Sequence, residues 1–261
     1  MTETVMIILI IIIIGLMGNR LHSLSTSGSL AAVVTGAAVF AGFGVRGLIV
    51  LGVFFATSSF WSKYQSASKA ALEEKLAKGS ARDWRQVLAN GGAAAAFSLL
   101  YFFQPDFLWL IGFSICIASA NSDTWASEIG PLSTKNPLFI PSLKRVEPGT
   151  SGAISLLGSI AAIGGSLLIA VVSTWLFSLT ITYGIMIFLF GFIGNMMDTI
   201  IGAFYQQLYI CSDCKIETEK RFHCGAKTVR IKGLSFVDND MVNFISGLIA
   251  AIAAILLIQF K

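Results

Sequence analysis

Long apolar runs dominate this chain and restrict the folds open to it. Val5–Met17, Gly28–Val45, Gly47–Trp61 and Gly152–Leu189 contain no charged residue. A membrane-spanning helix needs about 20 predominantly apolar residues. Only 12% of this chain is charged, against about 25% in a typical soluble domain. The sequence therefore predicts an all-α, polytopic integral membrane protein that forms a single transmembrane domain over residues 1–261.

The distribution of basic residues predicts the topology. Sixteen of the 18 lysines and arginines fall in four of the loops, whereas the other loops are short and nearly uncharged. Because basic loops stay in the cytoplasm, we expect these loops there and both termini outside the cell membrane. Two of them are long, a helical loop over 62–88 and a Cys-containing loop over 209–240. Eight transmembrane helices are expected, at about 4–19, 28–45, 46–61, 89–104, 107–126, 152–176, 180–208 and 241–260.

Two aspartates lie inside or at the edge of apolar stretches, each close to an asparagine. Asp123 follows Asn121, and Asp198 follows Asn195. An ionisable group near hydrocarbon costs about 2.5 kcal/mol or more and usually marks a functional site; the alternatives are a solvated helix end and an interhelical hydrogen-bonded pair. The topology brings both acids toward the cytoplasmic side, so Asp123, Asp198 and Asn195 are predicted to form one catalytic site. Because Mg²⁺ favours carboxylate oxygens, Asp123, Asp198 and Glu128 are its candidate ligands.

A glycine-containing loop is the candidate phosphate-binding element. Lys144 and Arg145 lead into Gly149–Gly152, and an apolar helix is expected to start there. Free N–H groups at a helix N-terminus bind anions, although a capped helix start after topogenic charges is the alternative. Asp240 is expected to cap the last helix. The candidate phosphate-binding residues are Asn90, Asn121, Ser122, Lys144, Arg145, Gly149, Thr150, Ser151, Gly152, Lys227 and Arg230.

Three of the four cysteines are clustered with a histidine. Cys211 and Cys214 have the C-x₂-C spacing, and His223 and Cys224 follow within one loop. This pattern is typical of a zinc site, here of a structural kind. A reduced loop without metal and a redox pair are the alternatives. Cys116 stands alone in an apolar stretch, where a packing role is expected.

These motifs together resemble a family of integral membrane proteins that includes plant phytyl-phosphate kinase and the transmembrane-protein-19 group. The family looks distantly similar to phytol kinase, dolichol kinase and the CDP-diacylglycerol synthases. The residues that carry the resemblance are Leu88–Gly92, Ala120–Gly130, Pro148–Gly152, Gly194–Ala203 and the Cys loop ending in Leu234–Asn243.

The resemblance implies a function in isoprenoid metabolism. A nucleotide-dependent kinase would convert a membrane isoprenyl monophosphate, of the phytyl, geranylgeranyl or farnesyl type, to the diphosphate. CTP or ATP would be the phosphate donor, with Mg²⁺ as cofactor and the lipid bilayer as the site of the substrate; a nucleic acid is not expected as a partner. Two rival classes remain, a transporter or flippase for a lipid phosphate or small anion, and a non-catalytic membrane scaffold organised by the Cys loop. Inverted repeats are common in transporters, and this sequence has no convincing repeat.

Overall fold

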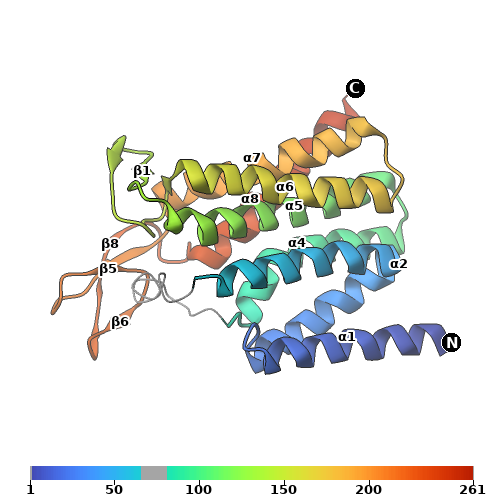
Figure 1. The fold of residues 1–261 in the computed structure, drawn as a ribbon, viewed down its shortest axis with the longest axis horizontal. Helices are drawn as coiled ribbons and strands as arrows, with labels where there is room; N and C mark the ends of the chain where they lie inside the picture. The colour runs from blue at the N-terminus through green and yellow to red at the C-terminus, as the bar shows by residue number, and fades with distance from the viewer. Residues whose placement is uncertain (1, 66–80, 261) are drawn as a thin grey trace.

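The structure, a computed structural model, describes residues 2–65 and 81–260 and is a bundle of long helices with small strands at one end (Figure 1). Six of the helices are long and apolar enough to cross a membrane. Within the described residues there are seven α-helices and a short 3₁₀ helix, η1 (Gly130–Leu132). The α-helices are α1 (Thr2–Arg20), α2 (Thr26–Lys63), α4 (Trp84–Phe103), α5 (Phe107–Ile129), α6 (Leu156–Leu176), α7 (Ile181–Tyr205) and α8 (Asn239–Gln259).

The expected count of eight helices is wrong, because the segments predicted at 28–45 and 46–61 form the single element α2. Its helical geometry is broken at Gly44, where φ is 60° and ψ is −150°. This conformation is essentially restricted to glycine. The chain reverses direction there, since Lys63 Nζ at one end of α2 donates to Leu21 O, just before the other end, at 2.8 Å. A straight helix of 38 residues would instead separate its ends by about 57 Å.

Side-chain caps explain why three helices begin away from the expected positions. Asp83 and Gln86 form a capping box, so α4 starts at Trp84 rather than at 89. Ser155 caps α6, which therefore begins after residue 152. Asp238, not Asp240, caps α8 by accepting from Met241 N at 3.0 Å. A short polar side chain at the N-cap contributes about 1 kcal/mol to helix stability, which is enough to fix these boundaries.

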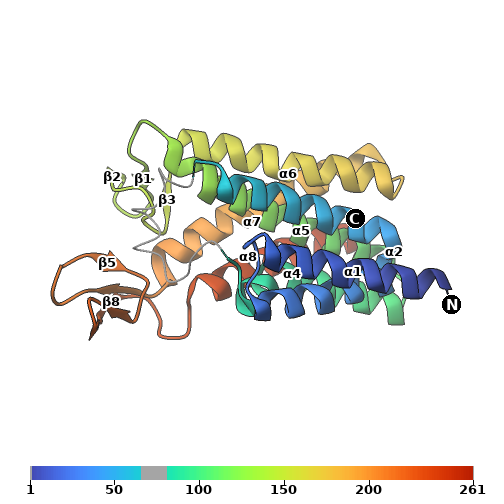
Figure 2. The ribbon, with the colours of Figure 1, turned by 60° about the horizontal axis from the view of Figure 1, so that its bottom comes forward.

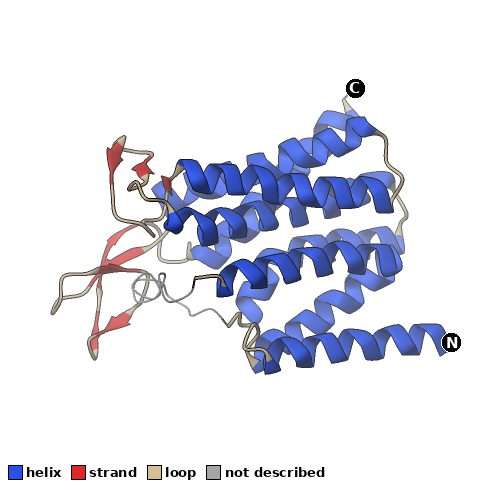
Figure 3. Cartoon of the chain, in the orientation of Figure 1, coloured by secondary structure: helices blue, strands red, loops and turns tan. Residues whose placement is uncertain are grey.

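The expectation of an all-α fold is incomplete, because the loops at one end of the bundle contain short antiparallel strands (Figure 3). These strands leave few backbone groups of the long loops without a partner. The first sheet has the order β2-β1-β3, the second β5-β4-β8, and β6 pairs with β7. The strands are β1 (Leu138–Phe139), β2 (Lys144–Arg145), β3 (Ala153–Ile154), β4 (Leu208–Ile210), β5 (Glu217–Thr218), β6 (Phe222–His223), β7 (Ala226–Lys227) and β8 (Val229–Lys232).

Helix α5 is the centre of the bundle, in contact with α2, α4, α6, α7 and α8. Ile111, Phe113, Ile115 and Ile117 on this helix are fully buried. By contrast, many large apolar side chains on the outer helices are exposed, as expected for a surface that faces lipid. The polar end of α5, with Asp123, therefore lies at the end of the central helix of the bundle.

Close packing around α5 depends on glycine at the points of contact. A Cβ on Gly194 of α7 would lie 2.2 Å from Ser119 Oγ and 2.7 Å from Ser119 Cβ of α5. Any larger residue at this position would therefore clash with α5 unless the helices moved apart. Small residues at such contacts let the backbones of two membrane helices approach closely. Both chain ends lie at the end of the bundle opposite the strands (Figure 2). The helical loop predicted over 62–88 falls mostly on residues outside the described ranges.

Candidate functional site

The strand-bearing end of the bundle encloses a polar cavity of about 780 Å³. This volume lies within the range of about 300–1,000 Å³ that is usual for small-molecule sites. Helices α4, α5, α7 and α8 supply its floor, and the loops before α6, α4 and α8 supply its walls. The cavity is rich in charged groups of both signs, which near a membrane need partners in the protein, water or a ligand.

The two aspartates predicted from the sequence meet in this cavity. Asp123 comes from α5 and Asp198 from α7, and the two carboxylates are close enough to repel one another. Asp198 accepts a hydrogen bond from Ser246 Oγ at 3.3 Å. Asn243 lies beside it, and the amide orientation that satisfies its donors gives Asp198 Oδ2 a second bond of 3.0 Å. Within the described residues no hydrogen bond reaches the Asp123 carboxylate, so this side of the pair is open to a cation.

Asn195 also lines the cavity, one helical turn before Asp198 on α7. The predicted spacing of three residues places both side chains on one helix face. Asn90 of α4 lines the cavity as well, and its amide donates to Gln86 O within its own helix. These two asparagines are available to a ligand in the cavity.

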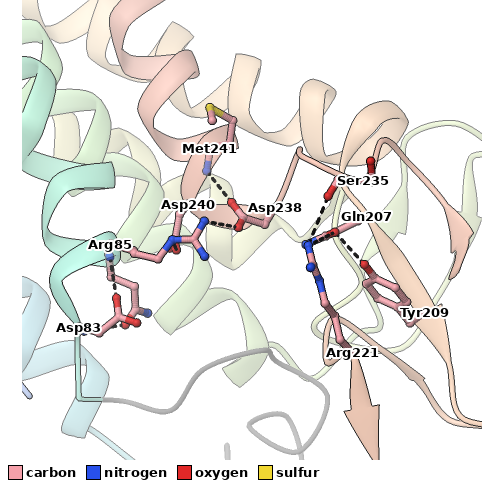
Figure 4. Close-up of polar contacts among 10 residues, drawn as sticks. Asp83, Arg85, Gln207, Tyr209, Arg221, Ser235, Asp238, Asp240 and Met241 are labelled. Carbon is pink, nitrogen blue, oxygen red and sulfur yellow. Dashed lines mark hydrogen bonds and ion pairs between the residues drawn. The ribbon is translucent and has the colours of Figure 1, made fainter. Parts of the chain in front are cut away.

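Among the residues that the structure describes, four cations line the cavity, and none was among the residues predicted to bind phosphate: Arg82, Arg85, Lys220 and Arg221. Arg85 forms ion pairs with Asp238 at 2.9 Å and with Asp240 at 3.8 Å (Figure 4). Arg221 reaches back to Gln207 Oε1 at 3.4 Å and to Ser235 O at 3.3 Å (Figure 4). The sequence marked these four residues only as members of the basic loops that set the topology, so it did not single them out as cavity residues.

Glu128 lies on the cavity wall in contact with other protein groups. Its Oε1 accepts from Ser62 Oγ at 2.6 Å, and Ser62 in turn accepts from Arg82 at 3.2 Å. Burial lowers the pKa of Arg82, and the Glu128 charge partly offsets this. An arginine keeps its charge under such conditions, so Glu128 helps to hold a buried cation at the cavity edge.

The Gly149–Gly152 loop lines the cavity, although not as the start of a helix. β3 and the cap Ser155 separate it from α6, so the expected helix N-terminus directly after Gly152 is wrong. The loop is instead fixed against α7. Ser151 Oγ donates to Gln206 at 2.8 Å, and Gly152 has φ of +84° and lies so close to Ala203 that a Cβ would clash. The first turn of α6 still borders the cavity through Ser155, Gly158 and Ser159.

Several predicted phosphate ligands lie away from the cavity. Asn121 and Ser122 are fully buried and bond to Gly165 O and Ala162 O of α6, both at 2.8 Å. Their polar groups hold helices together. The exposed strand residues Lys144, Arg145, Lys227 and Arg230 do not line the cavity either.

The predicted Cys/His residues converge into one cluster. One ligand atom from each of Cys211, Cys214, His223 and Cys224 lies within 4.8 Å of all the others. His223 and Cys224, although adjacent, both reach the cluster because Cys224 has a left-handed backbone, with φ of 51°. The cluster could hold a metal ion such as Zn²⁺. Cys116 is separate, buried in α5 with its Sγ 3.7 Å from Gly247 O.

The fold and the cavity together define a polytopic membrane protein with one polar, acid- and base-lined site at the end of a helix bundle. The chain belongs to the family described as integral membrane protein DUF92, which matches residues 9–251. The family resemblance predicted from the motifs is thus confirmed. No solved structure matches the chain at a significant level.

Relatives occur in archaea and plants. An uncharacterised membrane protein of Methanocaldococcus jannaschii is 34% identical over 209 residues, covering 77% of this chain and 82% of its own. Protein PGR of Arabidopsis thaliana is 29% identical over 255 residues, covering 88% and 87%. Protein VTE6, chloroplastic, of the same plant is 27% identical over 242 residues, covering 91% of this chain and 66% of the plant protein.

Proposed function

We propose that the protein is a kinase that converts an isoprenyl monophosphate to the diphosphate at the polar end of the bundle. The observation that carries the proposal is the meeting of Asp123 and Asp198, from two different helices, in one cavity to which the described residues also contribute four cations. Phosphoryl transfer requires acids that hold a metal, cations that hold phosphates, and correct positioning. The cavity supplies residues of each kind. The family resemblance points to an isoprenyl phosphate as the acceptor.

The acids suit Mg²⁺. This ion is commonly bound by one or two carboxylates together with substrate phosphate oxygens and water. Asp123, which no described residue hydrogen-bonds, and Asp198 would hold it, with Asn195 beside them. The bound ion would neutralise charge on the transferred phosphoryl group. Ser246 and Asn243 keep the Asp198 carboxylate in one orientation.

The cations suit the phosphates of the two substrates. Arg82, Arg85, Lys220 and Arg221 line the same cavity as the two acids, and arginine forms paired hydrogen bonds with phosphate. In the reaction, a phosphate oxygen of the isoprenyl monophosphate attacks the terminal phosphorus of CTP or ATP. The bond from that phosphorus to the bridging oxygen breaks, and the nucleoside diphosphate leaves. The cations offset the negative charge that both substrates bring together.

The membrane setting suits a lipid acceptor. The cavity lies at one end of the bundle, and the outer surfaces of the helices are apolar. An isoprenyl chain would remain in the bilayer while its phosphate reaches the cavity, and the nucleotide would enter from water.

The proposal is tested by incubating the purified protein in detergent with Mg²⁺, CTP or ATP, and isoprenyl monophosphates of several chain lengths. Formation of the diphosphate is expected. Asp123→Asn and Asp198→Asn should each lower turnover by about 100-fold or more, since each removes charge from the proposed metal site. Asp106→Asn is the matched control: Asp106 is an exposed N-cap of α5 outside the cavity, and asparagine caps equally well.

Two results would contradict the kinase proposal. One is full turnover by Asp123→Asn. The other is an absence of diphosphate with every donor and acceptor, combined with movement of a lipid phosphate across vesicle membranes, which would favour the transporter alternative.

A further inference from the structure

The Cys/His cluster lies beside the cavity wall. Cys211 directly follows β4, Cys214 lies in the turn before β5, and His223 and Cys224 lie in the β6–β7 hairpin. The segment from Glu219 to Phe222, which connects these two pairs, lines the cavity. A ligand that ties the two pairs together would therefore also fix both ends of a cavity wall.

The distances suit a tetrahedral ion. His223 Nδ1 lies 3.4 Å from Cys214 Sγ and 3.2 Å from Cys224 Sγ. With usual bond lengths, tetrahedral Zn²⁺ separates an imidazole nitrogen from a thiolate sulfur by about 3.6 Å and two sulfurs by about 3.8 Å. All four ligand atoms fall within 4.8 Å, so small side-chain shifts complete the geometry.

The backbone around the cluster is already arranged for four ligands. Cys211 N donates to Ile216 O at 3.0 Å and Lys215 N donates to Cys211 O at 3.1 Å, which closes a tight turn around Cys214. Lys215 and Cys224 both have left-handed backbones, with φ of 62° and 51°. This conformation is unfavourable for residues other than glycine, and here it turns the Cys224 side chain toward Cys214 and His223. Three thiolates and one imidazole fill a tetrahedral site and leave no position for a substrate, as in structural zinc sites.

Hydrogen bonds connect the wall segment, Glu219–Phe222, to other parts of the protein. Glu219 accepts from Gln206 Nε2 at 2.7 Å, and Gln206 also accepts from Ser151 of the glycine loop. Lys220 O accepts from Thr228 Oγ1 at 2.7 Å, which joins the segment to the residue between β7 and β8. Lys220 and Arg221 present their charges to the cavity.

We infer that Cys211, Cys214, His223 and Cys224 bind one structural Zn²⁺, and that the ion fixes the Glu219–Arg221 wall of the cavity. The positions of Lys220 and Arg221 in the cavity then depend on the ion. When the ion is removed, the two ends of their segment separate and the wall no longer has a fixed position. Neither the metal content nor the position of the wall depends on which reaction the cavity performs, so this inference and the kinase proposal can fail independently.

The metal is tested first. The full-length protein, purified in detergent under reducing conditions, should contain about one zinc per chain, measured by inductively coupled plasma mass spectrometry. Cys214→Ser and Cys224→Ser should retain less than about a tenth of this amount. Cys116→Ala is the matched control and should retain all of it, because Cys116 lies apart from the cluster in α5. Replacement by Co²⁺ should give the strong visible absorption of a tetrahedral thiolate site in the wild type and the control only.

The effect on the wall is tested by limited proteolysis with trypsin before and after chelation. Cleavage after Lys215, Lys220 and Arg221 should accelerate by about tenfold or more when zinc is removed, and re-adding Zn²⁺ should reverse this. Cleavage after Lys144 and Arg145, which lie in the other sheet, should not change.

Three outcomes would overturn the inference. They are a protein that lacks zinc and binds neither Zn²⁺ nor Co²⁺ after reduction, a zinc content that survives Cys214→Ser and Cys224→Ser together, and a wall segment whose cleavage is unchanged by chelation. A single serine substitution can still allow weak zinc binding. The variant that combines Cys214→Ser and Cys224→Ser, compared with Cys116→Ala, therefore decides the test.

Discussion

Substitution of Asn121 tests whether a buried polar side chain in this bundle binds a ligand or joins helices. The sequence predicts it as a phosphate ligand, whereas the structure uses its amide between helices. Its Nδ2 donates to Gly165 O at 2.8 Å, and its Oδ1 accepts from Thr57 at 3.1 Å and from Ser58 at 3.4 Å. Asn121→Ala removes all three bonds, which join α5 to α6 and to α2.

The expected cost follows from these bonds. Interhelical hydrogen bonds in membranes contribute about 0.6 kcal/mol each on average and up to about 1.7 kcal/mol. Three of them give about 2 kcal/mol. The Thr57 hydroxyl retains its bond to Val53 O at 2.8 Å, which keeps the total near this average rather than the maximum.

The assay is equilibrium unfolding in mixed micelles with increasing denaturing detergent, followed by tryptophan fluorescence. Trp125 is a suitable probe because its Nε1 lies 3.3 Å from Thr57 Oγ1, beside the altered site. Asn90→Ala is the matched control, since Asn90 lines the cavity, donates to Gln86 O of its own helix and has only a long interhelical contact, with Asn243 Nδ2 at 3.5 Å. It should change the free energy of unfolding by less than about 0.5 kcal/mol. A normal stability for Asn121→Ala, together with weaker substrate binding, would refute the structural role of Asn121.

Two further variants test the cavity itself. Gly152→Ala should destabilise the protein by about 2 kcal/mol or more and weaken nucleotide binding, because a Cβ at φ of +84° would lie 2.4 Å from Ala203 Cα. Gly225→Ala is the comparison, at φ of +75° with open space around it, and should lower the free energy of unfolding by about 1 kcal/mol in the mixed-micelle assay. Equal losses of stability for Gly152→Ala and Gly225→Ala would contradict the packing argument. Asp198→Asn should raise the melting temperature measured without Mg²⁺, since it removes repulsion from Asp123, and should abolish the further rise that Mg²⁺ gives the wild type. A melting temperature lowered by Asp198→Asn would mean that the carboxylate serves folding rather than a cation.

The helices were largely predictable because apolar runs of membrane length leave the chain few other structures. The break within α2 falls close to the boundary predicted between 28–45 and 46–61, but a single glycine, Gly44, takes the place of a loop, so the two predicted helices form one element. The early start of α4 depends on a capping box at Asp83 and Gln86, which lies outside the apolar run used to find the helix. The described strands are only two to four residues long and are held by pairing at a distance, so local pattern does not reveal them.

Asp123 and Asp198 were predictable because each lies in or beside an apolar stretch, and the helix spacing of their neighbours corrects part of the predicted site. Asn195 and Asp198 are three residues apart and share a helix face, and both line the cavity. Asn121 and Asp123 are two residues apart, which places them about 200° apart around a helix. They therefore face opposite ways, and Asn121 packs between helices while Asp123 faces the cavity.

The cations of the site were not predictable, because loops bring them there. Lys144 and Arg145 adjoin the glycine loop in sequence, yet β2 carries them away from the cavity. Arg82 reaches the cavity because its backbone pairs with the α1–α2 connection, where Ser25 N donates to Arg82 O at 2.9 Å. Arg221 reaches it from the Cys loop. Such paths depend on contacts between segments that are distant in sequence.

The bundle is closed very differently at its two ends. At the end away from the cavity, the chain turns at Gly44, over residues 104–106 and over residues 177–180. Turns this short tie neighbouring helices together and leave little room for insertions. At the other end, the longer connections before α6 and α8 line the cavity that holds the acids. Changes in these loops would therefore alter what the cavity admits, while the short turns at the far end would preserve the helix positions on which Asp123 and Asp198 depend.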